Sequence, residues 1–185
     1  NYPYKDLHGE SVPDSLRILT LEEFLDYSKE MGDFRYIIEI KNGGEEGKKA
    51  LDILYSVLKE RNLLDRVIFG TFKSEITEYA SDYYPDLIRS ASIKEALEFY
   101  WAALLGKKNY QPPVSVLQVF YGKNYFKYGV NFATSRVINY AHSHNMAIQY
   151  WTVNDEEDIE YLLSVGADGI MTDYVGKALE IKNRV

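Results

Sequence analysis

The stretch RYIIEIKNGG, residues 35–44, is the part of the sequence that most directly decides the fold. Its apolar run ends with Glu39 and Lys41 and then enters Asn42-Gly43-Gly44, a turn-forming sequence that precedes a helical pattern near 45–62. It predicts a β-strand at 35–41, followed by a loop and a helix. Because Glu39 and Lys41 are two residues apart, both side chains should lie on one face of the strand, at its C-terminal end.

The same alternation of strand and helix continues to the end of the chain. Strands are predicted at 66–72, 86–91, 114–121, 146–153 and 168–171, and the helices between and after them at 73–82, 92–105, 134–145, 155–164 and 175–182. One helix precedes the series, and Thr20 with Glu23 forms a capping box at its start. Strands that alternate with helices of this length predict an α/β fold with parallel strands and right-handed crossovers.

Two architectures fit this pattern, an open doubly wound sheet and a (β/α)8 barrel of the TIM type. Gln118 and Trp151 fall near the C-terminal ends of their strands, as Glu39 and Lys41 do, and barrel enzymes build their sites there. No G-x-G-x-x-G motif follows the first strand, which argues against a dinucleotide-binding sheet. Six strands correspond to three quarters of a barrel, and we expect one partial barrel domain over 1–185 with an irregular lead-in at 1–19.

Composition excludes several classes of partner and chemistry. The chain has 21 Lys and Arg against 28 Asp and Glu, a net charge of −7 that argues against nucleic acid as a partner. It has no cysteine, hence no disulfide and no thiolate zinc site. No apolar run approaches the roughly 20 residues that span a bilayer. The chain does not begin with Met, so we expect any targeting segment to lie upstream, and the compartment stays unassigned.

Six short motifs stand out along the chain: LTLEEFL at 19–25, the E-x-K pair at 39–41, LQV at 117–119, VINYAH at 137–142, WTVND at 151–155 and GADGIMTD at 166–173. Together they resemble the motifs of the glycerophosphodiester phosphodiesterase family. The E-x-K pair is weak by itself, whereas the last two motifs in this order are fairly specific. The resemblance runs from about residue 20 to residue 173.

The resemblance implies a (β/α)8 barrel of which this chain is strands three to eight. It implies metal-dependent hydrolysis of glycerophosphodiesters to an alcohol and glycerol 3-phosphate, in lipid and glycerol metabolism. Glu39 would ligate a divalent cation, Mg²⁺ or Ca²⁺, and Lys41 would contact the phosphate. Gln118, Trp151 and Phe72 would bind the substrate.

Other family motifs are absent from these 185 residues. The family's H-R-G, E-x-D and H-D motifs have no counterpart here, and His8, His142 and His144 match neither catalytic histidine. We therefore expect the catalytic histidines upstream, no catalytic residue in this chain, and no activity from it alone. The first and last strands should be unpaired edges, open to self-association.

Several alternatives remain open from the sequence. Glu39 and Lys41 could simply form a salt bridge, Trp151 could be core, and Gln118 could be a buried amide paired with a neighbour. The barrel could be a non-catalytic binding module, or an aldolase-like lyase that uses Lys41 as its Schiff-base lysine. Asp173 is predicted to cap the last helix, and the tyrosine-rich stretch 121–128 could form a wall of the substrate cleft or a surface patch.

Overall fold

The computed structural model describes residues 10–11, 18–122 and 129–184. The chain divides into two compact units, residues 1–36 and 37–185. The assignment of 1–185 to a single domain therefore stays a prediction.

The first unit contains one described helix, α1 (Leu21–Met31), whose start is fixed as the sequence predicts. The Thr20 hydroxyl accepts from the Glu23 amide at 3.3 Å, and the Glu23 carboxylate accepts from the Thr20 amide at 2.9 Å. At the other end, the Gly32 amide donates to the Ser28 carbonyl. The capping box therefore sets the helix boundary through local hydrogen bonds.

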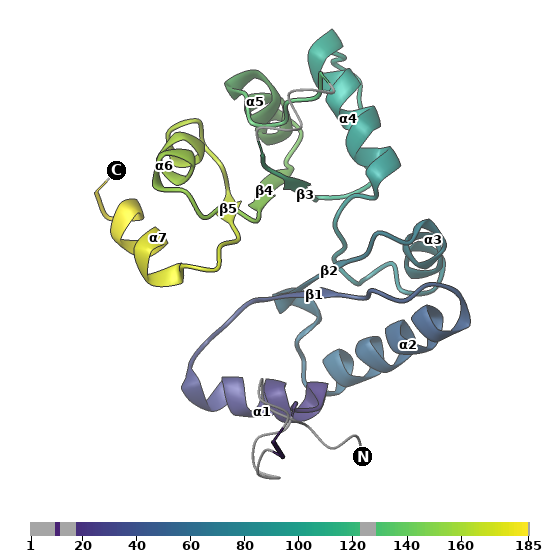
Figure 1. Cartoon of the computed structure of the whole chain (residues 1–185). Helices are drawn as coiled ribbons and strands as arrows, with labels where there is room; N and C mark the ends of the chain where they lie inside the picture. The colour runs from purple at the N-terminus through teal and green to yellow at the C-terminus, as the bar shows by residue number, and fades with distance from the viewer. Residues whose placement is uncertain (1–9, 12–17, 123–128, 185) are drawn as a thin grey trace. The chain divides into compact units, whose positions relative to one another are not determined.

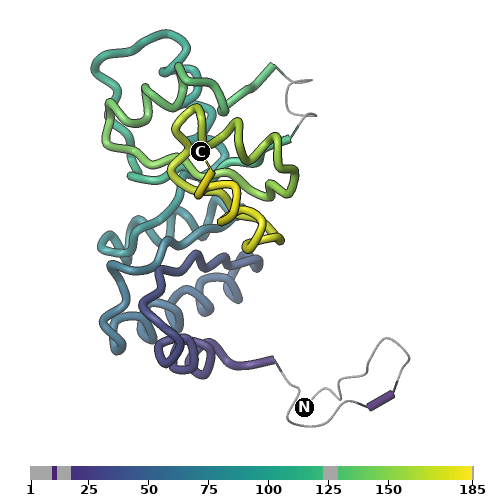
Figure 2. Tube along the Cα trace, turned by 90° about the vertical axis from the view of Figure 1, so that its left-hand side faces the viewer, coloured from purple at the N-terminus to yellow at the C-terminus, as the bar shows by residue number. Residues whose placement is uncertain are grey.

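The second unit alternates strands and helices in chain order (Figure 1), and Figure 2 follows the same chain as a Cα trace from another side. Its strands are β1 (Tyr36–Glu39), which starts at the last residue of the first unit, β2 (Val67–Gly70), β3 (Val116–Phe120), β4 (Ala147–Trp151) and β5 (Gly169–Ile170). Its helices are α2 (Gly44–Glu60), the short 3₁₀ helix η1 (Leu64–Arg66), α3 (Ser74–Tyr83), α4 (Ile93–Leu105), α5 (Ser135–Ser143), α6 (Glu156–Ser164) and α7 (Val175–Lys182).

The strands form two sheets that short bridges connect into one series. β1 pairs with β2, and β3, β4 and β5 pair in that order. Between the sheets lie two parallel bridges, Phe69 with Arg89 and Ser90 with Val116. β3 and β4 are parallel over five residue pairs, from Val116 opposite Ala147 to Phe120 opposite Trp151. The order of the series is therefore the order of the chain, as in a barrel.

Among the described residues, the two end strands have no strand partner on their outer sides, as the sequence predicts. β1 has β2 as its partner and β5 has β4, and no hydrogen bond within the described ranges joins residues 37–41 to residues 168–171. Self-association through these edges stays a prediction.

All the strands are shorter than predicted, and one of them is reduced the most. The strand expected at 86–91 is reduced to the bridge residues Arg89 and Ser90. The reason is a turn in which the Leu87 amide donates to the Tyr84 carbonyl at 3.0 Å, so the chain becomes extended only after it.

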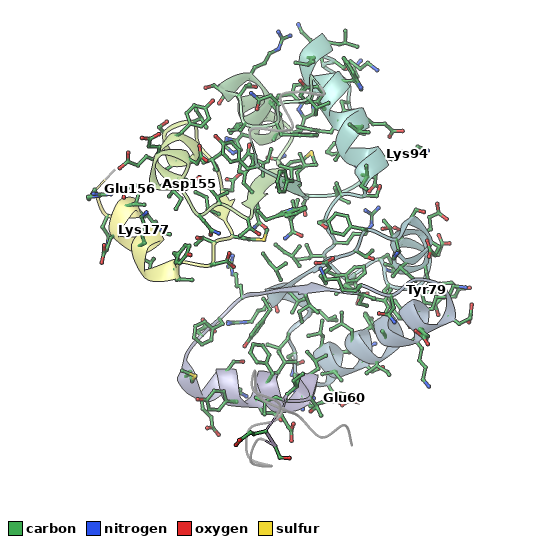
Figure 3. The ribbon with its side chains drawn as sticks, viewed as in Figure 1. Glu60, Tyr79, Lys94, Asp155, Glu156 and Lys177 are labelled. Atoms are coloured by element: carbon green, nitrogen blue, oxygen red, sulfur yellow. The ribbon has the colours of Figure 1, made fainter. Side chains whose placement is uncertain are left out.

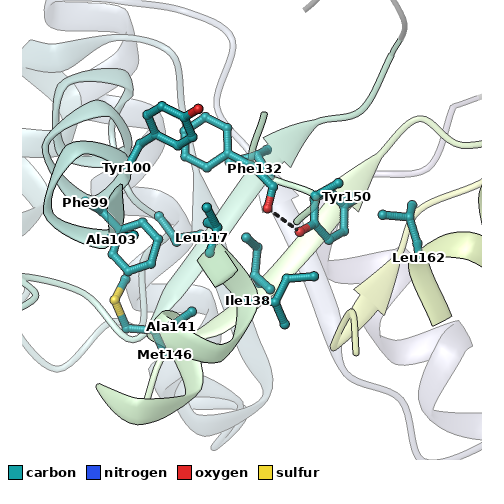
Figure 4. Packing of buried hydrophobic residues seen from close by; sticks show 14 of the residues in the cluster. Phe99, Tyr100, Ala103, Leu117, Phe132, Ile138, Ala141, Met146, Tyr150 and Leu162 are labelled. Carbon is teal, nitrogen blue, oxygen red and sulfur yellow. Dashed lines mark hydrogen bonds between the residues drawn. The ribbon is translucent and has the colours of Figure 1, made fainter. Parts of the chain in front are cut away.

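The largest buried cluster lies between β3–β4 and helices α4, α5 and α6 (Figure 4). Leu117, Ile148 and Tyr150 on the strands are completely buried, as is Ile138 on α5. The hydroxyl of Tyr150 donates to the carbonyl of Phe132 at 3.0 Å, so its one polar atom is satisfied. Burial also raises the pKa of this tyrosine well above its ordinary value.

Helices α2 and α3 cover the outer face of the first sheet with a smaller packed layer. Leu51, Leu58 and Ile76 are completely buried there. Tyr79 lies between the two helices, and its hydroxyl donates to Asp52 at 3.0 Å (Figure 3). Within the described residues, no helix is both long and apolar enough to cross a membrane.

Candidate functional site

A cavity of about 680 Å³ lies at the C-terminal ends of the strands in the second unit. β1, β2, β3 and β4 all contribute to its wall, as does the first half of α4. The sequence-predicted site residues all line it: Glu39, Lys41, Phe72, Gln118 and Trp151. Five residues that are far apart in the sequence are therefore gathered at the place where barrel enzymes build their sites.

Glu39 is the last residue of β1 and Lys41 lies two residues beyond it, and both face the same side, as their spacing predicts. Ile37, Glu39 and Lys41 line the cavity, whereas Ile40, between the two charged residues, is buried on the opposite face. Lys41 Nζ donates to Glu39 Oε2 at 2.7 Å. The Lys41 side chain is 75% exposed and that of Glu39 is 31% exposed, so this ion pair contributes little to stability.

The loop after β2 holds the end of β1 in place. Ile40 donates its amide to the Gly70 carbonyl at 3.0 Å and its carbonyl accepts from the Thr71 hydroxyl at 2.9 Å. The same hydroxyl accepts from the Lys73 amide at 3.1 Å, at the start of α3. Thr71 therefore links the ends of two adjacent strands and fixes the backbone between Glu39 and Lys41.

Three aromatic rings form one wall of the cavity. Phe72 and Phe120 each meet Trp151 edge to face, with ring centroids 5.7 Å and 5.3 Å apart. Phe72 is 55% exposed and Phe120 is 36% exposed, whereas Trp151 is half-buried between them. Trp151 thus faces the cavity and is not part of the buried cluster.

Gln118 both lines the cavity and is hydrogen-bonded to a neighbour. Its Nε2 donates to Gln149 Oε1 at 2.9 Å, and the two glutamines are opposite each other in the β3–β4 register. A side chain at Gly70 would come within 3.2 Å of Gln118 Oε1 and 3.3 Å of the Ser90 hydroxyl. The glycine therefore lets two polar groups approach the backbone of β2, on the floor of the cavity.

The chemistry of Glu39 fits one ligand of a hard divalent cation, since a carboxylate oxygen is the preferred donor for Mg²⁺ and Ca²⁺. Elsewhere in the described ranges, no group of three His, Asp or Glu side chains converges to hold a metal ion. The described part of the chain therefore offers a single ligand here.

His142, His144 and Asp173 do not line the cavity. His142 Nε2 lies 3.0 Å from Asp168 Oδ2, which also accepts from the Ile148 amide at 2.8 Å. The prediction that Asp173 caps α7 is wrong. Tyr174 occupies the cap position with no side-chain bond, because Asp173 instead accepts from Asn154 Nδ2 at 2.8 Å.

The tyrosine-rich stretch is described only at its start, and residues 123–128 lie outside the described residues. Tyr121 meets Tyr150 edge to face and its hydroxyl donates to Asp158 at 3.3 Å. Burial and the Asp158 carboxylate raise the pKa of Tyr121 to about 12. This tyrosine packs against the core and does not line the cavity that holds Glu39.

The lining residues that sequence reasoning missed include Ser90, Ile93, Leu97 and Phe120. Phe120 could have been found, because it is two residues beyond Gln118 on the same strand face. Ser90 follows the turn that shortens its strand. Ile93 and Leu97 are one helical turn apart on α4, and the sequence does not tell which side of that helix faces the strand ends.

The fold and the site together define a barrel of the (β/α)8 class with its site at the C-terminal strand ends. Residues 3–177 match the model of the glycerophosphoryl diester phosphodiesterase family, and the chain belongs to this family. The family's fold is the TIM barrel, so the sequence-based fold class is confirmed and the doubly wound alternative is excluded.

Curated relatives are distant in sequence and longer than this chain. An uncharacterized protein, YqiK, from Bacillus subtilis is 24% identical over 173 residues, which are 92% of this chain and 65% of that protein. A glycerophosphodiester phosphodiesterase from Bacillus altitudinis is 21% identical over all of this chain and 74% of its own length. The chain thus spans about two thirds to three quarters of these relatives.

Solved structures share the fold at low identity. A glycerophosphodiester phosphodiesterase from Parabacteroides distasonis superposes with a TM-score of 0.69 at 20% identity, covering 98% of this chain and 69% of that one. The Silicibacter pomeroyi protein named "putative glycerophosphoryl diester phosphodiesterase" has a TM-score of 0.67 at 19% identity, covering 89% of this chain and 56% of that one. An Oleispira antarctica phosphodiesterase in complex with the product sn-glycerol-3-phosphate has a TM-score of 0.58 at 16% identity. The match covers 88% of this chain and 60% of that one.

Proposed function

We propose that residues 1–185 supply the phosphate-contacting and substrate-lining part of a metal-dependent glycerophosphodiester phosphodiesterase. The reaction is hydrolysis of the diester to an alcohol and glycerol 3-phosphate. Family membership supports the reaction class. The observation that carries the proposal is that Glu39, Lys41, Gln118, Trp151 and Phe72 line one cavity at the C-terminal strand ends.

The residues of this chain would bind and orient the diester. The exposed Lys41 ammonium would leave Glu39 and donate to a phosphate oxygen, which favours the negative charge on the phosphoryl group. Glu39 would then be one oxygen ligand of Mg²⁺ or Ca²⁺. When bound, such a cation neutralises the charge that develops on the phosphoryl oxygens. Trp151 and Phe72 would pack against the alcohol, and Gln118 would hydrogen-bond to it from the cavity floor.

The family resemblance assigns proton transfer to two histidines that have no counterpart in these 185 residues. A general acid must protonate the leaving alcohol and a general base must activate the water. His142 and His144 line no part of the cavity. We therefore propose that the 185-residue chain alone is inactive.

The test compares this chain with a version extended at its N-terminus by the first two barrel strands. The extension is taken from the same gene if encoded there, and otherwise from the Bacillus altitudinis relative. Both proteins are incubated with glycerophosphocholine and Mg²⁺ or Ca²⁺, and glycerol 3-phosphate is measured by a coupled assay. We expect release from the extended protein only, and circular dichroism checks that it folds.

Turnover by the short chain would contradict the proposed inactivity. A folded extended protein that carries both histidines and has no turnover would contradict the proposed reaction and favour the non-catalytic binding module. The Glu39–Lys41 ion pair is the observation that keeps this module as a second candidate, because it satisfies both charges without a ligand. The lyase alternative has no support, since Lys41 is exposed and paired, whereas a Schiff-base lysine is activated by burial or a neighbouring cation.

A further inference from the structure

The loop between β1 and α2 is shaped by a carboxylate from another helix. A Cβ built at Gly43 would lie 2.4 Å from Oε1 of Glu75, on α3, so an alanine there would displace that carboxylate. Gly44 has a φ of +58°, a left-handed conformation that glycine adopts without strain. The two glycines of this loop therefore let the Glu75 carboxylate lie directly against its backbone.

Glu75 accepts hydrogen bonds at the N-terminal ends of two helices. Its Oε1 accepts from the amide of Gly44, the first residue of α2, at 3.3 Å. The N-cap residue of α2, Gly43, has no side chain that could do this. Glu75 also accepts from its own amide in the first turn of α3, and these two bonds hold its pKa below the ordinary value. A carboxylate is favoured at this place because both helix dipoles present their positive ends to it.

The bonds from the turn after β2 hold the backbone on both sides of Lys41. Before Lys41, Ile40 is bonded to the Gly70 carbonyl and to the Thr71 hydroxyl. After Lys41, the loop is bonded to Glu75. The Lys41 side chain is 75% exposed, so packing does little to fix its direction. The backbone that carries the side chain must therefore supply the precision that a functional group needs.

We propose that Glu75 is a positioning residue, which holds the loop after β1 and so fixes the backbone from which Lys41 reaches the phosphate of the substrate. The phosphate contact of Lys41 rests on the proposed function above. Glu75 itself does not line the cavity, so it would act only through the loop. Misplacing a group that contacts the substrate by about 1 Å can lower a rate on the order of 100-fold.

The competing explanation is that Glu75 only caps the two helices. A cap would lower the stability of the fold when removed, but its effect on the rate would not depend on Lys41. The test therefore uses a double-mutant cycle between Glu75→Ala and Lys41→Ala in the N-terminally extended protein, with kcat and KM measured for glycerophosphocholine. Urea unfolding of each variant measures stability separately.

Two further variants make the cycle specific. Glu75→Gln keeps a side-chain oxygen that can accept from the Gly44 amide, so it should restore most of the rate. Glu78→Ala is the matched control, since Glu78 is an exposed glutamate on the same helix. Glu75→Ala should lower kcat/KM by about tenfold or more, as loss of a supporting residue does elsewhere. In a Lys41→Ala protein it should change kcat/KM by less than about twofold.

Hydrogen exchange of the 185-residue chain tests the loop contact without any turnover. Glu75→Ala should speed exchange of the amides at 42–45, and Glu78→Ala should not. Gly43→Ala should have the same effect as Glu75→Ala, because its Cβ displaces the carboxylate from the Gly44 amide. Combining the two changes should add little to either one.

Equal fractional losses of rate from Glu75→Ala with and without Lys41 would overturn the proposal, and Glu75 would then be a helix cap. Unchanged exchange at 42–45 would also overturn it, because Glu75 would not hold the loop. Failure of the proposed function is recognised differently. Turnover would then be absent from the extended protein or unaffected by Lys41→Ala, while exchange at 42–45 still responds to Glu75→Ala. The positioning role would fail with it, and the loop contact would stand.

Discussion

β1 and β4 belong to the same series of barrel strands, but they differ in burial and in the side chains that they present to the cavity. β4 is a central strand with β3 and β5 on its two sides, and its outward residues Ile148 and Tyr150 are completely buried. β1 is an end strand with one partner, and its cavity face carries Ile37, Glu39 and Lys41, all exposed. The buried strand stabilises the fold, and the exposed strand carries the charges that can act on a substrate.

The sequence motifs at the ends of these two strands, E-x-K at 39–41 and WTVND at 151–155, also differ in what their residues do. The WTVND motif at the end of β4 has two roles. Trp151 lines the cavity. Asn154 is structural, because its Oδ1 accepts from the Thr172 hydroxyl and the Asp173 amide, both at 3.0 Å, and so ties the two strand-end loops together. The weak E-x-K pair on β1 places two charged groups in the cavity. Recognition from the sequence thus rests partly on residues that hold the barrel, such as Asn154, and partly on residues that line the cavity, such as Trp151.

The largest expected effect on stability is in β4. Ile148→Ala should lower the free energy of unfolding by about 2–5 kcal/mol, because it leaves a cavity in the packed cluster. Ile37→Ala on β1 should cost less than about 1 kcal/mol, since Ile37 is 45% exposed. Urea unfolding of both variants measures the difference, and equal losses would contradict the contrast between the strands.

A smaller effect on stability is expected from changing Glu95 on α4, which pairs with Arg89 in the middle of the strand series. Arg89 makes two 2.8 Å hydrogen bonds to Glu95, whose side chain is 18% exposed. Burial acts to raise the pKa of Glu95, but the hydrogen bonds from Arg89 and Ser92 outweigh it, so the pKa lies below its ordinary 4.5. Glu95→Gln should cost about 1–2 kcal/mol near neutral pH.

The pH dependence follows from the sign of that shift. A carboxylate with a lowered pKa stabilises the folded state above its ordinary pKa, and this contribution is lost as the pH falls through the folded-state value. The stability difference between wild type and Glu95→Gln should therefore be full near neutral pH and shrink below pH 4.5. A difference that grows on acidification would contradict the assigned ion pair.

Asn154→Ala should have a still smaller effect, about 1 kcal/mol, because its bonds to Thr172 and Asp173 lie partly in water. Hydrogen exchange should show faster opening of residues 152–155 and 172–174, with little change in β1. Unchanged exchange in both loops would show that this network does not join them.

Local physics explains what the sequence predicted and what it missed. The Thr20–Glu23 box and the two-residue spacing of Glu39 and Lys41 depend only on neighbours in the chain, and both were predicted correctly. Asp173 was assigned to a helix cap because its competitor, Asn154, is 19 residues away in sequence. The α4 side of the cavity was missed because the rotation of a helix against strand ends is set by tertiary packing.

The central claim is the proposed role of Glu39, at the end of β1, as a ligand of the divalent cation, and Glu39→Gln tests it most directly in the extended protein. Glu60→Gln is the matched control, since Glu60 is an exposed residue at the end of α2 (Figure 3). Glycerol 3-phosphate release is measured against the concentration of Mg²⁺ or Ca²⁺. Loss of a residue that merely supports a metal ligand costs about 10–100-fold, so loss of a ligand should cost at least about 100-fold.

We predict that Glu39→Gln lowers the rate by at least about 100-fold and shifts the cation dependence to higher concentration. Glu60→Gln should leave both unchanged, and both variants should unfold at the same urea concentration as the unaltered protein. A Glu39→Gln protein with activity within a few-fold of the unaltered protein would contradict the claim, and Glu39 would then be only the salt-bridge partner of Lys41.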